Sequence, residues 1–174
     1  MKRACATALL AVAVVAVGCA RAPSPPPPTT ATPITSAPAT LAIAGYSDGQ
    51  DVTLVEGAQG GFHVWMQYAV QDLPPGTVAL ERSATRASDG AVVLVYRGDV
   101  DVGAPDASGW WSAPSPIPMF MCPSPIGISV IDTPVDFVLR LLGDGDVELA
   151  RAAITLVPHC PDAQADFCTR ICSG

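Results

Sequence analysis

Short runs in which apolar and polar residues alternate recur along the chain from residue 52 onward, and each is bounded by Gly, Pro or Asp. A period of two with such boundaries is typical of half-buried strands joined by turns. The runs cover residues 52–55, 62–70, 78–87, 91–97, 119–122, 135–142 and 147–157. About seven strands of this kind predict an all-β fold, an immunoglobulin-like antiparallel β-sandwich.

Turn residues group some of these runs into hairpins. Ser88-Asp89-Gly90 connects the third run to the fourth, and Gly143-Asp144-Gly145 connects the last two. Asp-Gly between two β-prone runs is a strong hairpin signal. Only residues 163–171 suggest an amphipathic helix, with Asp162 as its N-cap.

The run 62–70 has two different faces. One face carries the predicted core residues Phe62, Val64, Met66, Tyr68 and Val70. The other carries His63, Trp65 and Gln67, since side chains two apart share a face of a strand. The adjacent glycines Gly60 and Gly61 allow a close backbone approach or a bulge just before it.

This second face has two interpretations. His63, Trp65 and Gln67 form a recognition surface, or His63 is hydrogen-bonded to the backbone and Trp65 is covered by a loop. Aromatic strand residues usually pack, which favours the covered arrangement. Trp110 and Trp111 pose the same question, because tandem aromatics can stack on a sugar ring or fill a partner's pocket, and alternation lets at most one of them face solvent.

The first 19 residues follow a different pattern. Lys2 and Arg3 precede an apolar segment, residues 4–17, that is too short to span a bilayer and reads as an export signal. Residues 16–19, Ala-Val-Gly-Cys, resemble the lipobox of bacterial lipoproteins, although Ala16 replaces the preferred Leu. An ordinary secretory signal with an incidental cysteine is the alternative.

The lipobox resemblance implies a signal peptide over 1–18 and fatty acylation (palmitate or a similar chain) of Cys19, which becomes the first residue of the mature chain. Two or three buried acyl chains hold a protein on a membrane essentially permanently, at about 0.8 kcal/mol per methylene. Ala20 stands where inner-membrane lipoproteins often carry Asp. The resemblance therefore implies a lipid-anchored protein of the bacterial cell envelope, at the outer membrane.

Residues 20–40 consist almost wholly of Pro, Ala, Thr and Ser, a composition that cannot bury enough apolar surface to fold. As a polyproline II spacer they would reach about 60 Å. We therefore expect residues 19–40 to be a lipidated linker and 41–174 to form one β-sandwich domain.

Charge narrows the choice of partners. Without Lys2 and Arg3 the mature chain keeps seven basic residues, all arginine, against 16 acidic ones, a net charge of −9. Coulomb repulsion from phosphate backbones excludes nucleic-acid binding. The expected partners are the membrane, through Cys19, and an envelope protein or glycan of unknown identity.

The cysteines outside the signal and the lipobox are Cys122, Cys160, Cys168 and Cys172. An even number in an oxidising compartment predicts two disulfides, for which three pairings exist. We favour Cys122 with Cys160, because each ends a predicted strand, and Cys168 with Cys172, one helical turn apart. A thiolate metal site with His159 is the alternative, but it lacks paired Cys-x-x-Cys knuckles.

Candidate chemistry is sparse. No nucleophile elbow, zinc-protease helix, phosphate-binding loop or dinucleotide fingerprint is present. The segment 57–65 resembles a stretch near the first strands of uncharacterised lipoproteins of GC-rich myxobacteria, which implies no activity. The sequence thus favours a non-catalytic binding or scaffolding module that needs no cofactor.

Two rival functions stay open. A periplasmic copper protein would use imidazoles and thioethers, from the set His63, Met66, Met119, Met121 and His159. Alternation places Met66 opposite His63, which argues against this set. An envelope hydrolase would instead need a solvent-connected cleft with His63 or His159 beside a carboxylate.

Overall fold

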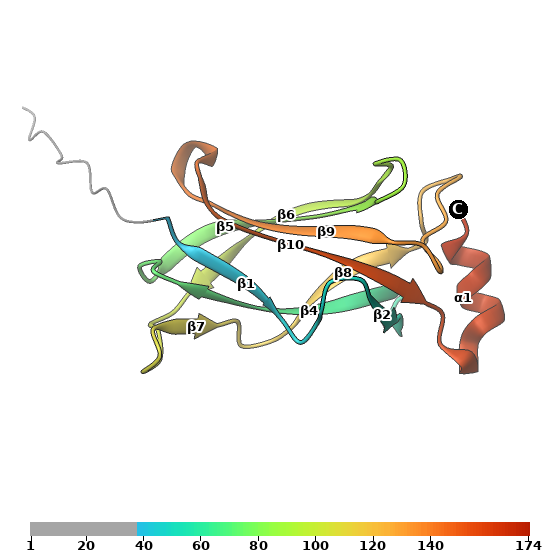
Figure 1. Cartoon of the computed structure of the whole chain (residues 1–174), viewed down its shortest axis with the longest axis horizontal. Coiled ribbons are helices and arrows are strands. Elements are labelled where there is room, and N and C mark those ends of the chain that lie inside the picture. Colours follow the sequence, from blue (N-terminus) through green and yellow to red (C-terminus); the bar gives the residue numbers. More distant parts are fainter. Residues whose placement is uncertain (1–37) are drawn as a thin grey trace, which may run out of the picture. The chain divides into compact units, whose positions relative to one another are not determined.

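Two β-sheets and a short C-terminal helix make up residues 38–174, the part of the chain that the computed structural model describes (Figure 1). The predicted signal, Cys19 and all but the end of the predicted linker lie outside these residues. The first strand begins at Thr40, one residue before the expected start of the domain.

The first sheet is organised around one long strand, β4 (Phe62–Gln71). Its C-terminal half lies between β1 (Thr40–Ala44) and β7 (Trp110–Ser112), both antiparallel to it. Its N-terminal half lies between β3 (Val55–Glu56) and β8 (Ile117–Cys122), also antiparallel.

The second sheet has the strand order β2-β10-β9-β5-β6. Its members are β2 (Gln50–Thr53), β10 (Glu148–His159), β9 (Val135–Leu142), β5 (Gly76–Arg86) and β6 (Val92–Val102). All neighbours are antiparallel except β2, which pairs in parallel with the end of β10. The sheet thus ends in a strand of four residues on one side and a strand of 11 residues on the other.

The inner faces of the two sheets form the core. Phe62, Val64, Met66, Tyr68 and Val70 are buried, as alternation predicts. Phe137, Leu139 and Leu141 of β9 face them from the second sheet and are fully buried. Each such side chain contributes about 1.5–3 kcal/mol of hydrophobic free energy on burial.

The immunoglobulin-like β-sandwich, its disulfides and the short terminal helix are confirmed, and both predicted hairpins form as β5–β6 and β9–β10. Residues 38–174 contain ten strands rather than about seven. The run 52–55 divides at Leu54, because β2 pairs in the second sheet and β3 in the first. Leu54 is buried at this crossing and donates its backbone N–H to the His159 carbonyl at 2.8 Å.

The C-terminal helix starts later than expected. A 3₁₀ turn, Asp162–Gln164 (η2), precedes α1 (Ala165–Cys172), and neither has a side-chain cap, so Asp162 does not act as the predicted N-cap. Gln164 instead donates a side-chain hydrogen bond to the Glu56 carboxylate. This contact joins the helical segment to β3.

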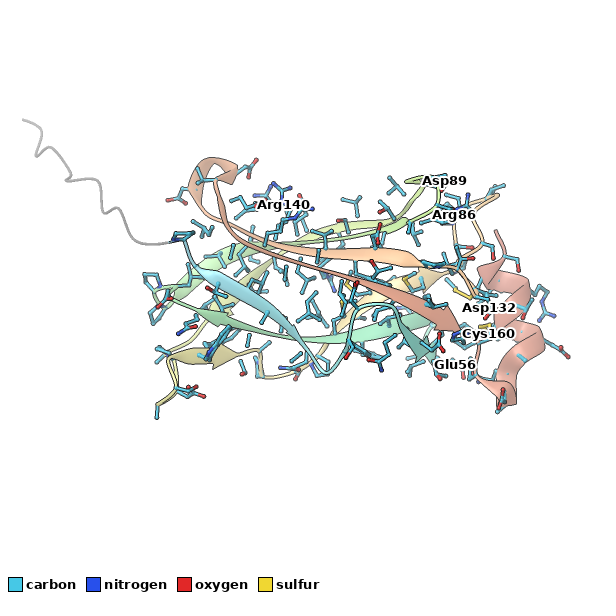
Figure 2. The ribbon with its side chains drawn as sticks, in the orientation of Figure 1. Glu56, Arg86, Asp89, Asp132, Arg140 and Cys160 are labelled. Atoms are coloured by element: carbon cyan, nitrogen blue, oxygen red, sulfur yellow. A yellow bond between two sulfur atoms is a disulfide. The ribbon has the colours of Figure 1, made fainter. Side chains whose placement is uncertain are left out.

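The favoured disulfide pairing is wrong. The bonds join Cys122 to Cys172 and Cys160 to Cys168, and Figure 2 shows Cys160 beside α1. Cys122 ends β8 of the first sheet, whereas Cys160 follows β10 of the second, and α1 lies across both strand ends. The two helix cysteines therefore each take a strand-end partner, although their Sγ atoms are only 3.7 Å apart. We call this region, α1 with the ends of β8 and β10, the helix-capped end.

Candidate recognition surface

The outer face of the first sheet carries an aromatic cluster. His63 and Trp65 of β4 lie with their ring centroids 5.8 Å apart, and Phe120 of β8 stands edge-on to the His63 ring at 4.6 Å. Phe120 and His63 are cross-strand neighbours. Trp65 keeps 38% and Phe120 46% of its surface exposed, so the cluster presents two aromatic rings to solvent.

His63 itself is covered. It is buried, its Nδ1 has no hydrogen-bond partner, and Gly57 lies directly over its ring, where a Cβ would overlap the imidazole Cε1. Gly61 also passes close to Cys122, since a Cβ there would lie 2.5 Å from the Cys122 carbonyl oxygen. The strand pairing also shifts register between Phe62 and His63. The glycines thus produce the close approach, whereas the irregularity in the pairing comes from the extra residue Met121 in β8. Trp65 rather than His63 faces solvent.

The remaining predicted recognition residues lie elsewhere on this sheet. Gln67 donates its side-chain amide to the Ala113 carbonyl at 2.5 Å. Trp111 pairs with Val70 and packs on the Tyr68 ring at 6.0 Å, on the core side. Trp110 pairs with Gln71 and shares the outer face, at the opposite end of β4 from His63. The structure therefore does not bring the two tryptophans together with the His63 cluster.

A groove that the sequence reasoning missed opens beside Phe120, between the two sheets. It has a volume of about 410 Å³. Its lining comes from β5, β6 and β8 and consists of Leu80, Arg82, Tyr96, Gly98, Asp99, Val100, Ile117, Pro118 and Phe120. Tyr96 is 47% exposed at its mouth. We call this groove with its two bordering strands, β6 and β8, the open flank.

Arg82 is the central polar group of the open flank. It is 8% exposed, donates Nη1 to the Pro118 carbonyl at 2.7 Å, and lies over the Tyr96 ring at 4.1 Å. Burial lowers the pKa of the guanidinium, which nevertheless stays charged at neutral pH. Within residues 38–174 no carboxylate forms an ion pair with it. The sequence did contain a signal, because Arg82 interrupts the apolar row Val78, Leu80, Ala84 of its strand.

His159 lies at the helix-capped end, between two carboxylates. Its Nδ1 is 2.5 Å from an Asp132 oxygen and its Nε2 2.9 Å from an Asp51 oxygen. These hydrogen bonds raise the pKa of His159. Each acid accepts from a different ring nitrogen, so the three groups form an ion-paired clip between β10, β2 and the loop before β9, and they are not ligands converging on one point.

The predicted copper ligands are dispersed. Met66, Met119 and Met121 are buried in the core, on the opposite face of the sheet from His63. The one group of clustered metal-ligand side chains among residues 38–174 is Cys160, Cys168 and Cys172, and these sulfurs are in disulfides. Neither histidine lines the groove of the open flank or the roughly 490 Å³ cavity around Leu73.

No helix among the described residues is long and apolar enough to cross a membrane. No protein-family model and no curated protein matches the chain. Two structures of a glycosyl hydrolase family 2 member from Bacteroides cellulosilyticus are similar to it, each at 16% identity over 68% of this chain with a TM-score of 0.39. The matched region spans only 14% and 13% of those chains.

Proposed function

We propose that this protein is an envelope lipoprotein whose β-sandwich is a non-catalytic binding module, held on the outer membrane through Cys19. The observation that carries the binding role is the open flank, an apolar groove with Tyr96 and Phe120 exposed at its border. Exposed aromatic residues around an apolar hollow are typical of recognition sites.

The path of the chain supports display away from a membrane. The described residues start at the end of the sandwich opposite α1 (Figure 1). A tether attached there leaves both the open flank along the sandwich and the helix-capped end accessible to other envelope components. The disulfides Cys122–Cys172 and Cys160–Cys168 suit an oxidising compartment.

The anchor is tested by metabolic labelling with a clickable fatty acid in the host bacterium. The full chain should incorporate the label and fractionate with the outer membrane, and Cys19→Ala should do neither. An unlabelled wild-type chain that is soluble after lysis would contradict the proposal.

The binding role is tested by crosslinking in intact cells. The mature chain has no lysine, so amine-directed reagents are unsuitable, and a photoreactive phenylalanine analogue is placed instead. One position is Phe120 at the open flank and the other is Ala153, exposed on the outer face of β10. A binding module gives discrete adducts from at least one position, whereas an absence of adducts from both contradicts a binding role.

A further inference from the structure

The long edge strand of the second sheet lacks a neighbour. Within residues 38–174, β6 pairs only with β5. The backbone N–H and C=O groups along its outer edge are therefore free to accept another strand. Natural edge strands are usually protected by shortness, charged side chains, proline or a β-bulge. β2 is short, whereas β6 has 11 residues and no proline. Its bulge at Val93 lies near its first residue, so the pairing of residues 94–102 with β5 is regular.

The groove lies directly beside this edge. The inward row of β6, Tyr96, Gly98 and Val100, lines it together with Phe120. Gly98 leaves room for the Tyr96 ring, since a Cβ there would lie 3.1 Å from the ring Cε1. A strand added to β6 would place every second side chain over this groove.

The buried charge of Arg82 in the groove predicts the chemistry of one side chain of the added strand. Arg82 is buried with one carbonyl and one aromatic ring as its partners, and a buried cation is stabilised most by a hydrogen-bonded carboxylate. The outward row of β6 carries Asp99 and Asp101, together with Arg97, whose charge is paired with Asp146. The complementary segment therefore has one acid among apolar residues on its inward face and neutral or basic residues on its outward face.

We propose that the open flank binds an extended segment of another envelope protein, which adds as a strand to β6 and directs one carboxylate to Arg82. This inference deepens the proposed binding function and rests on it. A second copy of this chain fits poorly, because the inward row of its β6 contains no acid. Antiparallel pairing of two β6 strands would also place the starting ends of the sandwiches at opposite ends of the pair.

The experiment begins with the photoreactive analogue at Phe120 in the full, anchored chain. The captured segment is sequenced, synthesised, and titrated against the full chain extracted in mild detergent. The variants are Arg82→Met, which removes the charge at similar volume, and Arg151→Met, which removes an exposed arginine from the outer face of β10 as a matched control. A second peptide replaces the acid by its amide.

The expected segment contains an acid flanked by apolar residues at alternate positions. Arg82→Met and the amide peptide should each weaken binding about tenfold or more, with little further loss when combined, whereas Arg151→Met should leave it unchanged. Alternate β6 amides should become protected from hydrogen exchange when the peptide binds. If the unfolding temperature of Arg82→Met is close to that of the wild type, its loss of affinity is not caused by a folding defect. If Arg82→Met unfolds at a clearly lower temperature, the affinity of the wild-type chain for the amide peptide tests the role of the carboxylate instead.

Other outcomes would overturn the inference. These are a segment without an acid, equal loss of affinity in Arg82→Met and Arg151→Met, a captured second copy of this chain, or no peptide adduct from Phe120. Adducts from Ala153 alone would keep the proposed binding function but show that the open flank is not the binding site. Loss of fatty acylation with an intact Arg82-dependent complex would remove the anchor and keep the strand addition.

Discussion

The helix-capped end and the open flank differ in how the two sheets of the sandwich are connected at their borders. At the helix-capped end, α1 joins the two sheets, because its cysteines bond to Cys122 of the first sheet and to Cys160 after the second, and Phe167 contacts Phe62. The His159 clip adds contacts within the second sheet, between β10, β2 and the loop before β9. At the open flank, Arg82 and its bond to the Pro118 carbonyl join β5 to β8 beside a hollow of about 410 Å³.

We infer from this difference that the helix-capped end supplies most of the stability, whereas the open flank supplies the proposed binding surface. Covalent and apolar contacts concentrated at one end leave the other region free to keep exposed aromatic rings and an unpaired buried charge, both of which are costly for folding alone. If this division is correct, substitutions at the helix-capped end will unfold the protein, and comparable substitutions at the open flank will not.

Two phenylalanines give the largest contrast. Phe62 is fully buried and its ring centroid lies 5.9 Å from that of Phe167 in α1, whereas Phe120 is 46% exposed. Phe62→Ala should lower the free energy of unfolding by about 3–5 kcal/mol, and Phe120→Ala by about 1 kcal/mol. Urea unfolding of the full chain measures both, and similar losses would contradict the division.

The disulfides differ by the length of chain they close. Cys122–Cys172 spans 50 residues and Cys160–Cys168 spans eight. Loop entropy predicts a loss of about 4 kcal/mol when both cysteines of the first bond become alanine and about 2.5 kcal/mol for the second. The same unfolding measurement tests the order, with disulfide mapping by mass spectrometry as the control, and a greater loss from the shorter loop would contradict it.

A substitution of Gly57 tests whether the backbone at this position covers the His63 ring. An alanine Cβ at this position overlaps the imidazole, so Gly57→Ala should cost about 1–3 kcal/mol through overpacking. In a His63→Ala background the space is vacant, and the same substitution should cost less than about 0.5 kcal/mol. An equal loss of unfolding free energy in the two backgrounds would show that Gly57 is not required to make room for the His63 ring.

The sequence predicts the sandwich well because alternation reports which side of a strand is buried. The core row of β4 and both hairpins follow directly from the pattern and the Asp-Gly turns. It does not predict β1 and β7, which are five and three residues long. Strands this short acquire their pairing from β4 rather than from their own periodicity.

The candidate sites are harder to predict because they depend on which strands become neighbours. The pattern places His63 and Trp65 on one face, but only the approach of Gly57 decides that His63 is covered. The cysteine pairing fails for a similar reason, since the position of α1 across two strand ends is a tertiary property. Arg82 could have been recognised as a charge in an apolar row, but not as part of a groove with Phe120.

His159 gives the smallest effect and tests whether the clip at the helix-capped end contributes to stability. Hydrogen bonds that His159 donates to the Asp51 and Asp132 carboxylates raise its pKa in the folded state above its ordinary value, so folding favours the protonated ring. Its stabilisation is then fully present below the unfolded pKa of about 6.5 and is lost as the pH rises through the raised folded pKa.

The imidazole is partly exposed, which limits the gain to about 0.5 kcal/mol through solvent screening. The free energy of unfolding of the wild type, minus that of His159→Gln, should therefore be larger at pH 5.5 than at pH 8.5. Asp132→Asn should reduce this difference, because it weakens one of the two hydrogen bonds. A difference that grows with pH would show that the ring is neutral in the folded protein, and the clip would then not belong to the contacts that make the helix-capped end the more stable region.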